Sequence, residues 1–249
     1  MASKVVTACM IIIGNEILSG RTQDVNLNFL AKALNEVGVR LTESRIIPDV
    51  ESVIIDTVNE CRAKFDHVFT TGGIGPTHDD ITAVCIAKAF NVKIVLHPEI
   101  VKLIESREAP PEVMDSRMLM ARVPEGARLI ENATGGPPGF QIENVFVMAG
   151  VPKVMQAMAA SLDKERLEGG EPVRSRSIGA YLGESQVANA LAEIQNQHPH
   201  VDVGSYPFFR KDGYGTNLVI RGTDEDELDL IKEKIRKMIL SFDAEPFEE

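Results

Sequence analysis

Short β-rich runs alternate with amphipathic segments along the first two-thirds of this chain. Val5–Ile13 is a continuous apolar run, which is typical of a strand that is covered on both faces. Asn26–Val37 then carries apolar residues at helical spacing, and Gly38 ends that helix. Repeated β–α units require right-handed crossovers, so they predict a three-layer α/β/α domain around a mostly parallel sheet.

The order of elements changes after a short linker. Glu165–Pro172 contains a pair of glycines and is typical of a connection between domains. Beyond it the pattern becomes β, α, β, β, α, which predicts a second, small α+β domain. We therefore expect a first domain over residues 1–167 and a second domain over residues 172–249.

A glycine-rich loop, TTGGIGPTHDD, lies at Thr70–Asp80, between an expected strand and an expected helix at Asp79–Phe90. Parallel sheets bind ligands beyond the carboxyl ends of their strands, where such loops lie. Glycines allow a close backbone approach, and the free amides of a helix N-terminus attract anions. We therefore expect a phosphorylated small molecule to contact the following residues: Thr71, Gly72, Gly73, Gly75, Pro76 and Thr77.

Two adjacent carboxylates, Asp79 and Asp80, follow these glycines. Such a pair repels phosphate unless it binds a divalent cation or transfers protons, so we predict that both hold Mg²⁺, Mn²⁺ or Co²⁺ and take part in catalysis. An alternative role for Asp79 is to cap the following helix, and for Asp80 to interact with its dipole.

Several segments carry a resemblance to a known family. GGIGPTHDDIT closely resembles the motif of the molybdopterin-binding superfamily, which includes MoaB, Mog and the N-terminal domain of CinA, the competence/damage-inducible protein A. Gly14–Gly20, Asn132–Phe140 and Met148–Met158 agree in order with CinA. Ile178–Leu191 and Gly204–Phe209 resemble the small KH-like domain that follows in CinA proteins. The resemblance to the CinA family therefore covers nearly the whole chain.

The resemblance implies roles for further acids. Asp80 matches the aspartate essential to the superfamily's chemistry, and Asp49 matches a second functional acid of the Mog branch. Asp49 also follows Pro48 and precedes an expected helix, so helix capping is an equally good interpretation. Glu16 matches the acid of the family's GxE pattern, and we assign it to the catalytic group.

The resemblance also adds two residues to the expected ligand site. Asn26 matches the Asn of the family's D-T-N triplet, although Val25 replaces its Thr. Gly139 belongs to the proline-rich PPGF loop, which is a CinA feature.

The family resemblance implies a hydrolase, namely a nucleotide pyrophosphatase that acts on ADP-ribose-like compounds. One alternative is a molybdopterin-binding or adenylyl-transferring protein of the Mog type, which would use the same loop for the pterin phosphate. Another is a ligand-binding module without turnover. The C-terminal amidase activity of CinA is not expected here, because the sequence ends at Glu249.

The composition restricts the partners. The net charge is -11 and no dense Lys/Arg cluster occurs, which argues against nucleic acids and anionic membranes. The apolar run at Val5–Ile13 is also too short for a membrane helix, which needs about 20 residues. Three dispersed cysteines fit a reducing compartment, so we expect a cytoplasmic protein. The resemblance further implies a homo-oligomer.

Overall fold

The chain divides into two compact units in the computed structural model, Met1–Glu171 and Pro172–Glu249. The structure describes residues 5–163, 166–167, 169–211 and 213–248. Two positions of the expected linker, 165 and 168, lie outside the described residues. Each unit buries its own set of apolar side chains.

A six-stranded sheet runs through the first unit in the order β2-β1-β3-β8-β7-β6. The first four strands are parallel, whereas β7 and β6 are antiparallel to their neighbours. The bounds of these strands are Val6–Ile13 (β1), Val39–Ile47 (β2), His67–Thr71 (β3), Arg128–Ile130 (β6), Gly139–Ile142 (β7) and Val145–Met148 (β8). The expected mostly parallel sheet is confirmed.

Strand β1 is buried on both faces because its alternate side chains enter two different cores. The odd-numbered residues from Cys9 to Ile13 pack into one core, and the even-numbered residues from Ala8 to Ile12 pack into the other. The second core also holds the stacked rings of Phe69 and Phe146, whose centroids lie 4.9 Å apart.

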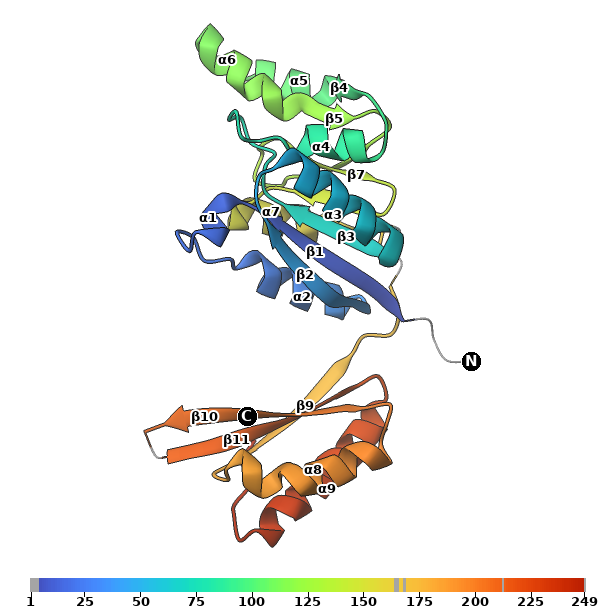
Figure 1. Cartoon of the computed structure of the whole chain (residues 1–249), viewed down its shortest axis with the longest axis vertical. Helices are drawn as coiled ribbons and strands as arrows, with labels where there is room; N and C mark the ends of the chain where they lie inside the picture. Colours follow the sequence, from blue (N-terminus) through green and yellow to red (C-terminus); the bar gives the residue numbers. More distant parts are fainter. Residues whose placement is uncertain (1–4, 164–165, 168, 212, 249) are drawn as a thin grey trace. The chain divides into compact units, whose positions relative to one another are not determined.

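Helices cover both faces of the sheet, as Figure 1 shows. α2 and α7 contribute apolar residues to the core with the stacked rings, whereas α3, α4 and α5 contribute to the other core. Their bounds are Asn26–Glu36 (α2), Glu51–Lys64 (α3), Thr82–Ala89 (α4), Pro98–Glu105 (α5) and Pro152–Ala160 (α7). This arrangement confirms the expected three-layer α/β/α fold.

Two predicted element bounds are wrong. α4 begins at Thr82 rather than at Asp79, because both aspartates of the loop bind the Thr77 side chain instead of entering the helix. The expected loop Asn132–Phe140 ends earlier, because Gly139 already pairs with Ile130 as the first residue of β7.

Shorter elements complete the first unit. β4 and β5 form a separate two-stranded antiparallel sheet. The bounds of the short elements are Asn15–Leu18 (α1), Ile94–Leu96 (β4), Pro111–Met118 (α6), Leu119–Ala121 (a 3-10 turn) and Arg122–Pro124 (β5).

The second unit has the expected β-α-β-β-α order. Its antiparallel sheet has the strand order β10-β11-β9, and α8 and α9 bury their apolar residues against it. The side chain of Asp224 caps α9 by accepting a hydrogen bond from the amide of Glu227. The bounds are Arg174–Ala180 (β9), Glu184–Gln197 (α8), Asp202–Arg210 (β10), Gly213–Gly222 (β11) and Glu225–Ser241 (α9). The expected small α+β unit is confirmed.

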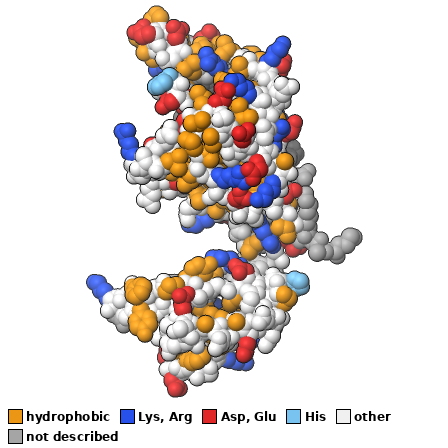
Figure 2. Space-filling model, viewed as in Figure 1, with side chains coloured by type: hydrophobic (Ala, Val, Ile, Leu, Met, Phe, Trp, Pro, Cys, Tyr) orange, Lys and Arg blue, Asp and Glu red, His pale blue; other side chains and the backbone are white. Residues whose placement is uncertain are grey.

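The described part of the chain has no helix with the length and apolar character needed to cross a membrane. On the face of the first unit that Figure 2 shows, Lys and Arg side chains lie among Asp and Glu side chains. This view shows no large basic patch, in keeping with the acidic composition.

We predict that limited proteolysis cuts the intact chain first between residues 168 and 172. The reason is that each unit buries its own core, so a cut between them exposes little apolar surface. Mass spectrometry of the fragments should find two stable pieces with ends in this segment. A first stable cut inside Gly72–Pro138 would contradict the expected domain division.

Candidate functional site

A cleft of about 590 Å³ opens at the carboxyl-terminal edge of the parallel strands. Ile13 ends β1, and Asp49, Gly72 and Ala149 follow the ends of β2, β3 and β8; all four residues line the cleft. Ligands of parallel α/β sheets bind at this edge, and small-molecule sites usually measure about 300–1,000 Å³. The cleft also brings together most of the residues expected from the sequence: Glu16, Asp49, Gly72, Gly73, Gly75, Pro76, Thr77, Asp79 and Asp80.

The glycine-rich loop is fixed to the protein at its start. Gly72 and Gly73 have φ angles of 103° and 67°, which favour glycine. The buried Thr82 binds both of them, since its hydroxyl donates to the carbonyl of Gly72 at 3.0 Å and its amide donates to that of Gly73 at 2.9 Å. The first turn of α4 thus holds the loop in place.

Three successive loop amides have no hydrogen-bond partner among the described residues. They belong to Gly73, Ile74 and Gly75, all of which line the cleft. Successive free amides next to a residue of positive φ attract anions. The first turn of α4 does not line the cleft and its Thr82 amide is already used, so the loop amides are better placed than the helix N-terminus to bind a phosphate.

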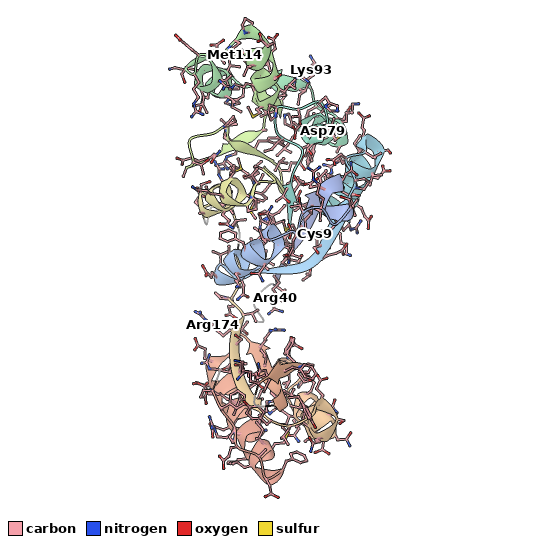
Figure 3. All side chains as sticks on the ribbon, turned by 90° about the vertical axis from the view of Figure 1, so that its left-hand side faces the viewer. Cys9, Arg40, Asp79, Lys93, Met114 and Arg174 are labelled. Carbon is pink, nitrogen blue, oxygen red and sulfur yellow. The ribbon has the colours of Figure 1, made fainter. Side chains whose placement is uncertain are left out.

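Thr77 binds both neighbouring carboxylates. Its amide donates to Asp80 Oδ2 at 2.8 Å, and its hydroxyl lies 2.6 Å from Asp79 Oδ1 and in contact with Asp80 Oδ2. The N-cap of α4 is Ile81, which makes no side-chain capping bond. The capping alternative for Asp79 is therefore wrong. Asp79, labelled in Figure 3, belongs to the loop before α4.

Two carboxylates of the cleft lie directly against glycine backbone. A Cβ atom on Gly75 would lie 2.6 Å from Asp80 Oδ2, and one on Gly14 would lie 2.6 Å from both carboxylate oxygens of Glu16. Contacts this short do not occur with a real side chain, so each acid occupies space that only a glycine leaves open. The glycines therefore leave room for both carboxylates where they lie, and a side chain at either position would displace the end of the acid.

Asp49 is a capping residue, although not of the helix that follows it. Its Oδ2 accepts a hydrogen bond from the amide of Asn15, the first residue of α1, at 2.9 Å. The N-cap of α3 is Val50, which has no side chain capable of capping. Asp49 thus fixes the turn that carries Glu16 while it lines the cleft.

The cleft is strongly acidic. Glu16, Asp49, Asp79 and Asp80 line it, and no Lys, Arg or His is among its lining residues. The Thr77 hydroxyl donates to Asp79 and lowers the pKa of that carboxyl below its ordinary value. Such a site attracts cations and repels a free phosphate.

The side chains of the cleft can supply only a few ligands to a metal ion. Among the described residues, no group of three or more His, Cys, Asp or Glu side chains is arranged to hold an ion. Mg²⁺ is commonly bound through one or two carboxylates together with substrate phosphates and water. The adjacent Asp79 and Asp80 fit that mode and would need a ligand to complete the coordination.

Three residues expected at the ligand do not line the cleft. Asn26 is buried and supports the cleft wall from behind, because its Nδ2 donates to the carbonyl of Gly150 at 2.8 Å. Thr71 is 1% exposed within β3. Gly139 lies in β7, where a Cβ would come within 2.4 Å of the Val147 carbonyl oxygen, so close strand packing explains this glycine.

Sequence reasoning missed two polar residues that shape the cleft. One is Thr82, whose place two residues after the aspartate pair was the available signal. The other is Asn132, which opens the segment NATGGPPGF and lines the cleft. Its Nδ2 donates to the carbonyl of Pro137 at 3.0 Å, and its Oδ1 accepts from the amide and hydroxyl of Thr134. Asn132 therefore closes this loop on itself.

We expect Gly75→Ala to displace the Asp80 carboxylate without unfolding the protein. The new Cβ meets the end of one side chain, so we expect a loss of about 1 kcal/mol in the free energy of unfolding, together with a loss of ligand or metal binding. Chemical denaturation and calorimetric titration measure the two effects. Gly183→Ala is the control, because its nearest new contact is an ordinary 3.5 Å. Unchanged binding in Gly75→Ala would show that Asp80 need not occupy this position.

We expect Thr77→Val to raise the pKa of Asp79, because the hydroxyl that stabilises its charged form is removed. In the parent protein the lowered pKa adds stability above the unfolded-state pKa, and this stability is lost as pH falls through the folded-state pKa. Carboxyl NMR titration of both proteins measures the shift. Thr134→Val is the control, because Thr134 also lines the cleft but binds Asn132. An equal pKa of Asp79 in parent and Thr77→Val contradicts this assignment.

Comparison with known proteins adds the family. Residues 9–169 match the family described as "Probable molybdopterin binding domain", and residues 172–245 match the one described as "FAD synthase, middle domain". A protein of Archaeoglobus fulgidus is 33% identical over 234 residues, which cover 94% of this chain and 95% of that protein. A "Probable FAD synthase" of Caenorhabditis briggsae is 26% identical over 263 residues, but this chain spans only 50% of its length.

A solved structure supports the same assignment. The CinA protein of Thermoplasma acidophilum, described as having unknown function, superimposes with a TM-score of 0.59 at 29% identity. The match covers 65% of this chain and 98% of that one. The chain therefore belongs to the family of the probable molybdopterin-binding domain, and its first unit is the CinA-like form of that domain.

Proposed function

We propose that the first unit is a metal-dependent pyrophosphatase that hydrolyses ADP-ribose-like compounds. The observation that carries this proposal is the composition of the cleft, in which unpartnered loop amides lie with four carboxylates and no basic side chain. Amides suit a phosphate, whereas the carboxylates suit a cation that accompanies it. The substrate class comes from the resemblance to the CinA N-terminal domain.

Asp79 and Asp80 would hold the divalent cation. Asp80 keeps its Oδ1 free of hydrogen bonds within the described structure, while its Oδ2 is fixed by Thr77. A divalent cation held there would supply charge neutralisation and lower the pKa of a bound water. The chain's own part is to hold both aspartates in position through the Thr77 amide and hydroxyl, and the hydroxyl also favours the charged form of Asp79.

The remaining groups bind the substrate and accept a proton. The amides of Gly73, Ile74 and Gly75 would hold one phosphate through its oxygens. A water oxygen forms a bond to phosphorus, and the bridging P–O–P bond breaks to release AMP and ribose 5-phosphate. One of the two other carboxylates that line the cleft, Asp49 or Glu16, would accept the proton that the water loses.

A second candidate is a protein that binds molybdopterin or transfers an adenylyl group. The description of the matched family, a probable molybdopterin-binding domain, favours it. The same loop amides would then hold the single phosphate of a pterin. Incubation with ADP-ribose, related dinucleotides and Mg²⁺, Mn²⁺ or Co²⁺, followed by detection of AMP, tests the first proposal. Binding of a pterin phosphate without AMP release would favour the second, or a module without turnover.

We expect Asp80→Asn to reduce turnover by a factor on the order of 10²–10⁴, because it removes a charge that acts on the transition state. Binding of intact ADP-ribose without metal should weaken little, since the lost carboxylate repels phosphate. Initial rates of AMP release and the melting temperature are measured together. Asp115→Asn is the matched control, because Asp115 is exposed on α6 and lines no described cavity. An Asp80→Asn variant that melts lower yet keeps the parent's rate would remove Asp80 from the mechanism.

A further inference from the structure

A second, smaller cavity lies beside the acidic cleft. It measures about 130 Å³, and its lining residues are Leu103, Ile104, Arg107, Arg117, Met120 and Pro137. Met120 and Pro137 line the main cleft as well. The two cavities are therefore neighbours with a shared wall, although one carries four carboxylates and the other two guanidinium groups.

Neither guanidinium of the small cavity is neutralised by an acid. Arg107 donates from Nη2 to the carbonyl of Gly135, and Arg117 donates from Nη1 to the carbonyl of Arg107 at 3.2 Å. Within the described structure neither forms an ion pair with a carboxylate, whereas Arg45 binds both Glu43 and Glu60 at 2.6 Å. A guanidinium has five N–H donors, so each of the two keeps donors for an incoming anion.

We propose that Arg107 and Arg117 form a second anion site, which takes the distal phosphate of a ligand with two linked phosphates. This inference rests on the proposed function, since it names how the same cleft selects its substrate. Guanidinium groups bind phosphate through paired N–H donors, and they stay charged at all relevant pH values. The loop amides hold one phosphate, and the arginines across Met120 and Pro137 hold the other.

The two anion positions distinguish ligands with two linked phosphates from monophosphates. A pyrophosphate-containing compound places one phosphate in the acidic cleft and a second next to the arginines, whereas a monophosphate can satisfy only one of these positions. The unequal charge of the two cavities also orients the ligand, because its metal-bound phosphate prefers the carboxylates. Arg107 and Arg117 thus make the cleft selective for diphosphates over monophosphates.

Calorimetric titration with inorganic pyrophosphate and inorganic phosphate, with and without Mg²⁺, tests the proposal. Arg117→Gln is the main variant, because Arg107 also holds the loop carbonyl of Gly135. It should weaken pyrophosphate binding by about tenfold to a hundredfold, the range for a lost charge-assisted bond. Phosphate binding should change by less than about twofold. Arg117→Lys should restore part of the loss, and Arg122→Gln, exposed on β5 outside both cavities, should bind as the parent does.

The outcomes separate this inference from the proposed function. If the parent binds pyrophosphate no tighter than phosphate, or if Arg117→Gln binds pyrophosphate as the parent does, the anion site is wrong, even when AMP is released from ADP-ribose. If pyrophosphate binding depends on Arg117 but no AMP appears, the anion site stands and the hydrolase assignment fails. Melting temperatures within about 2 °C of the parent show that the variants are folded.

Discussion

Burial of β1 on both faces is the constraint on which the first unit depends. Its side chains alternate between two cores, so helices must cover the sheet on each side. The strands beside it are then connected by crossovers through those helices, and parallel strands end at a common edge. The acidic cleft lies at that edge because residues at or just after the ends of β1, β2, β3 and β8 meet there.

Glycine residues, which allow other groups to approach the backbone closely, shape the cleft at this edge. Gly72 and Gly73 turn the chain away from β3, and the buried Thr82 binds their carbonyls. Gly14 and Gly75 leave the space that the carboxylates of Glu16 and Asp80 occupy. Catalytic groups need such fixed supports, because small displacements of a charged group alter its interaction with a reacting phosphate. The site is thus built mainly from backbone geometry, with the acids placed against it.

The sequence allowed a good prediction of the fold and of the loop that carries the site. The continuous apolar run of β1 and the glycine loop between strand and helix are local signals, and the structure has both. Asp79 and Asp80 illustrate the limit of such signals. Acids before a helical pattern suggest the start of a helix. Their hydrogen bonds to Thr77 keep both acids in the loop, so α4 begins only after Ile81. Local propensity could not reveal this competition.

Contacts between distant segments were not predictable from one sequence. Asp49 caps α1, which lies 34 residues earlier, and nothing near Asp49 in the sequence indicates that partner. Gly139 was assigned to the ligand from its motif, whereas its strand neighbour Val147 explains the glycine. The arginines beside the cleft come from the segment around α5 and α6, which carries no recognisable motif. Each case depends on chain topology.

The contact between Gly75 and the Asp80 carboxylate has a consequence for related sequences. Because one position leaves the space that the other fills, the two should change together among relatives. A relative that has lost the acid no longer needs the glycine, and one that has gained a side chain at the glycine must place the carboxylate elsewhere. The same holds for Gly14 and Glu16. An intact glycine–acid pair is thus a covariation signature that identifies relatives able to keep a charged group at this place.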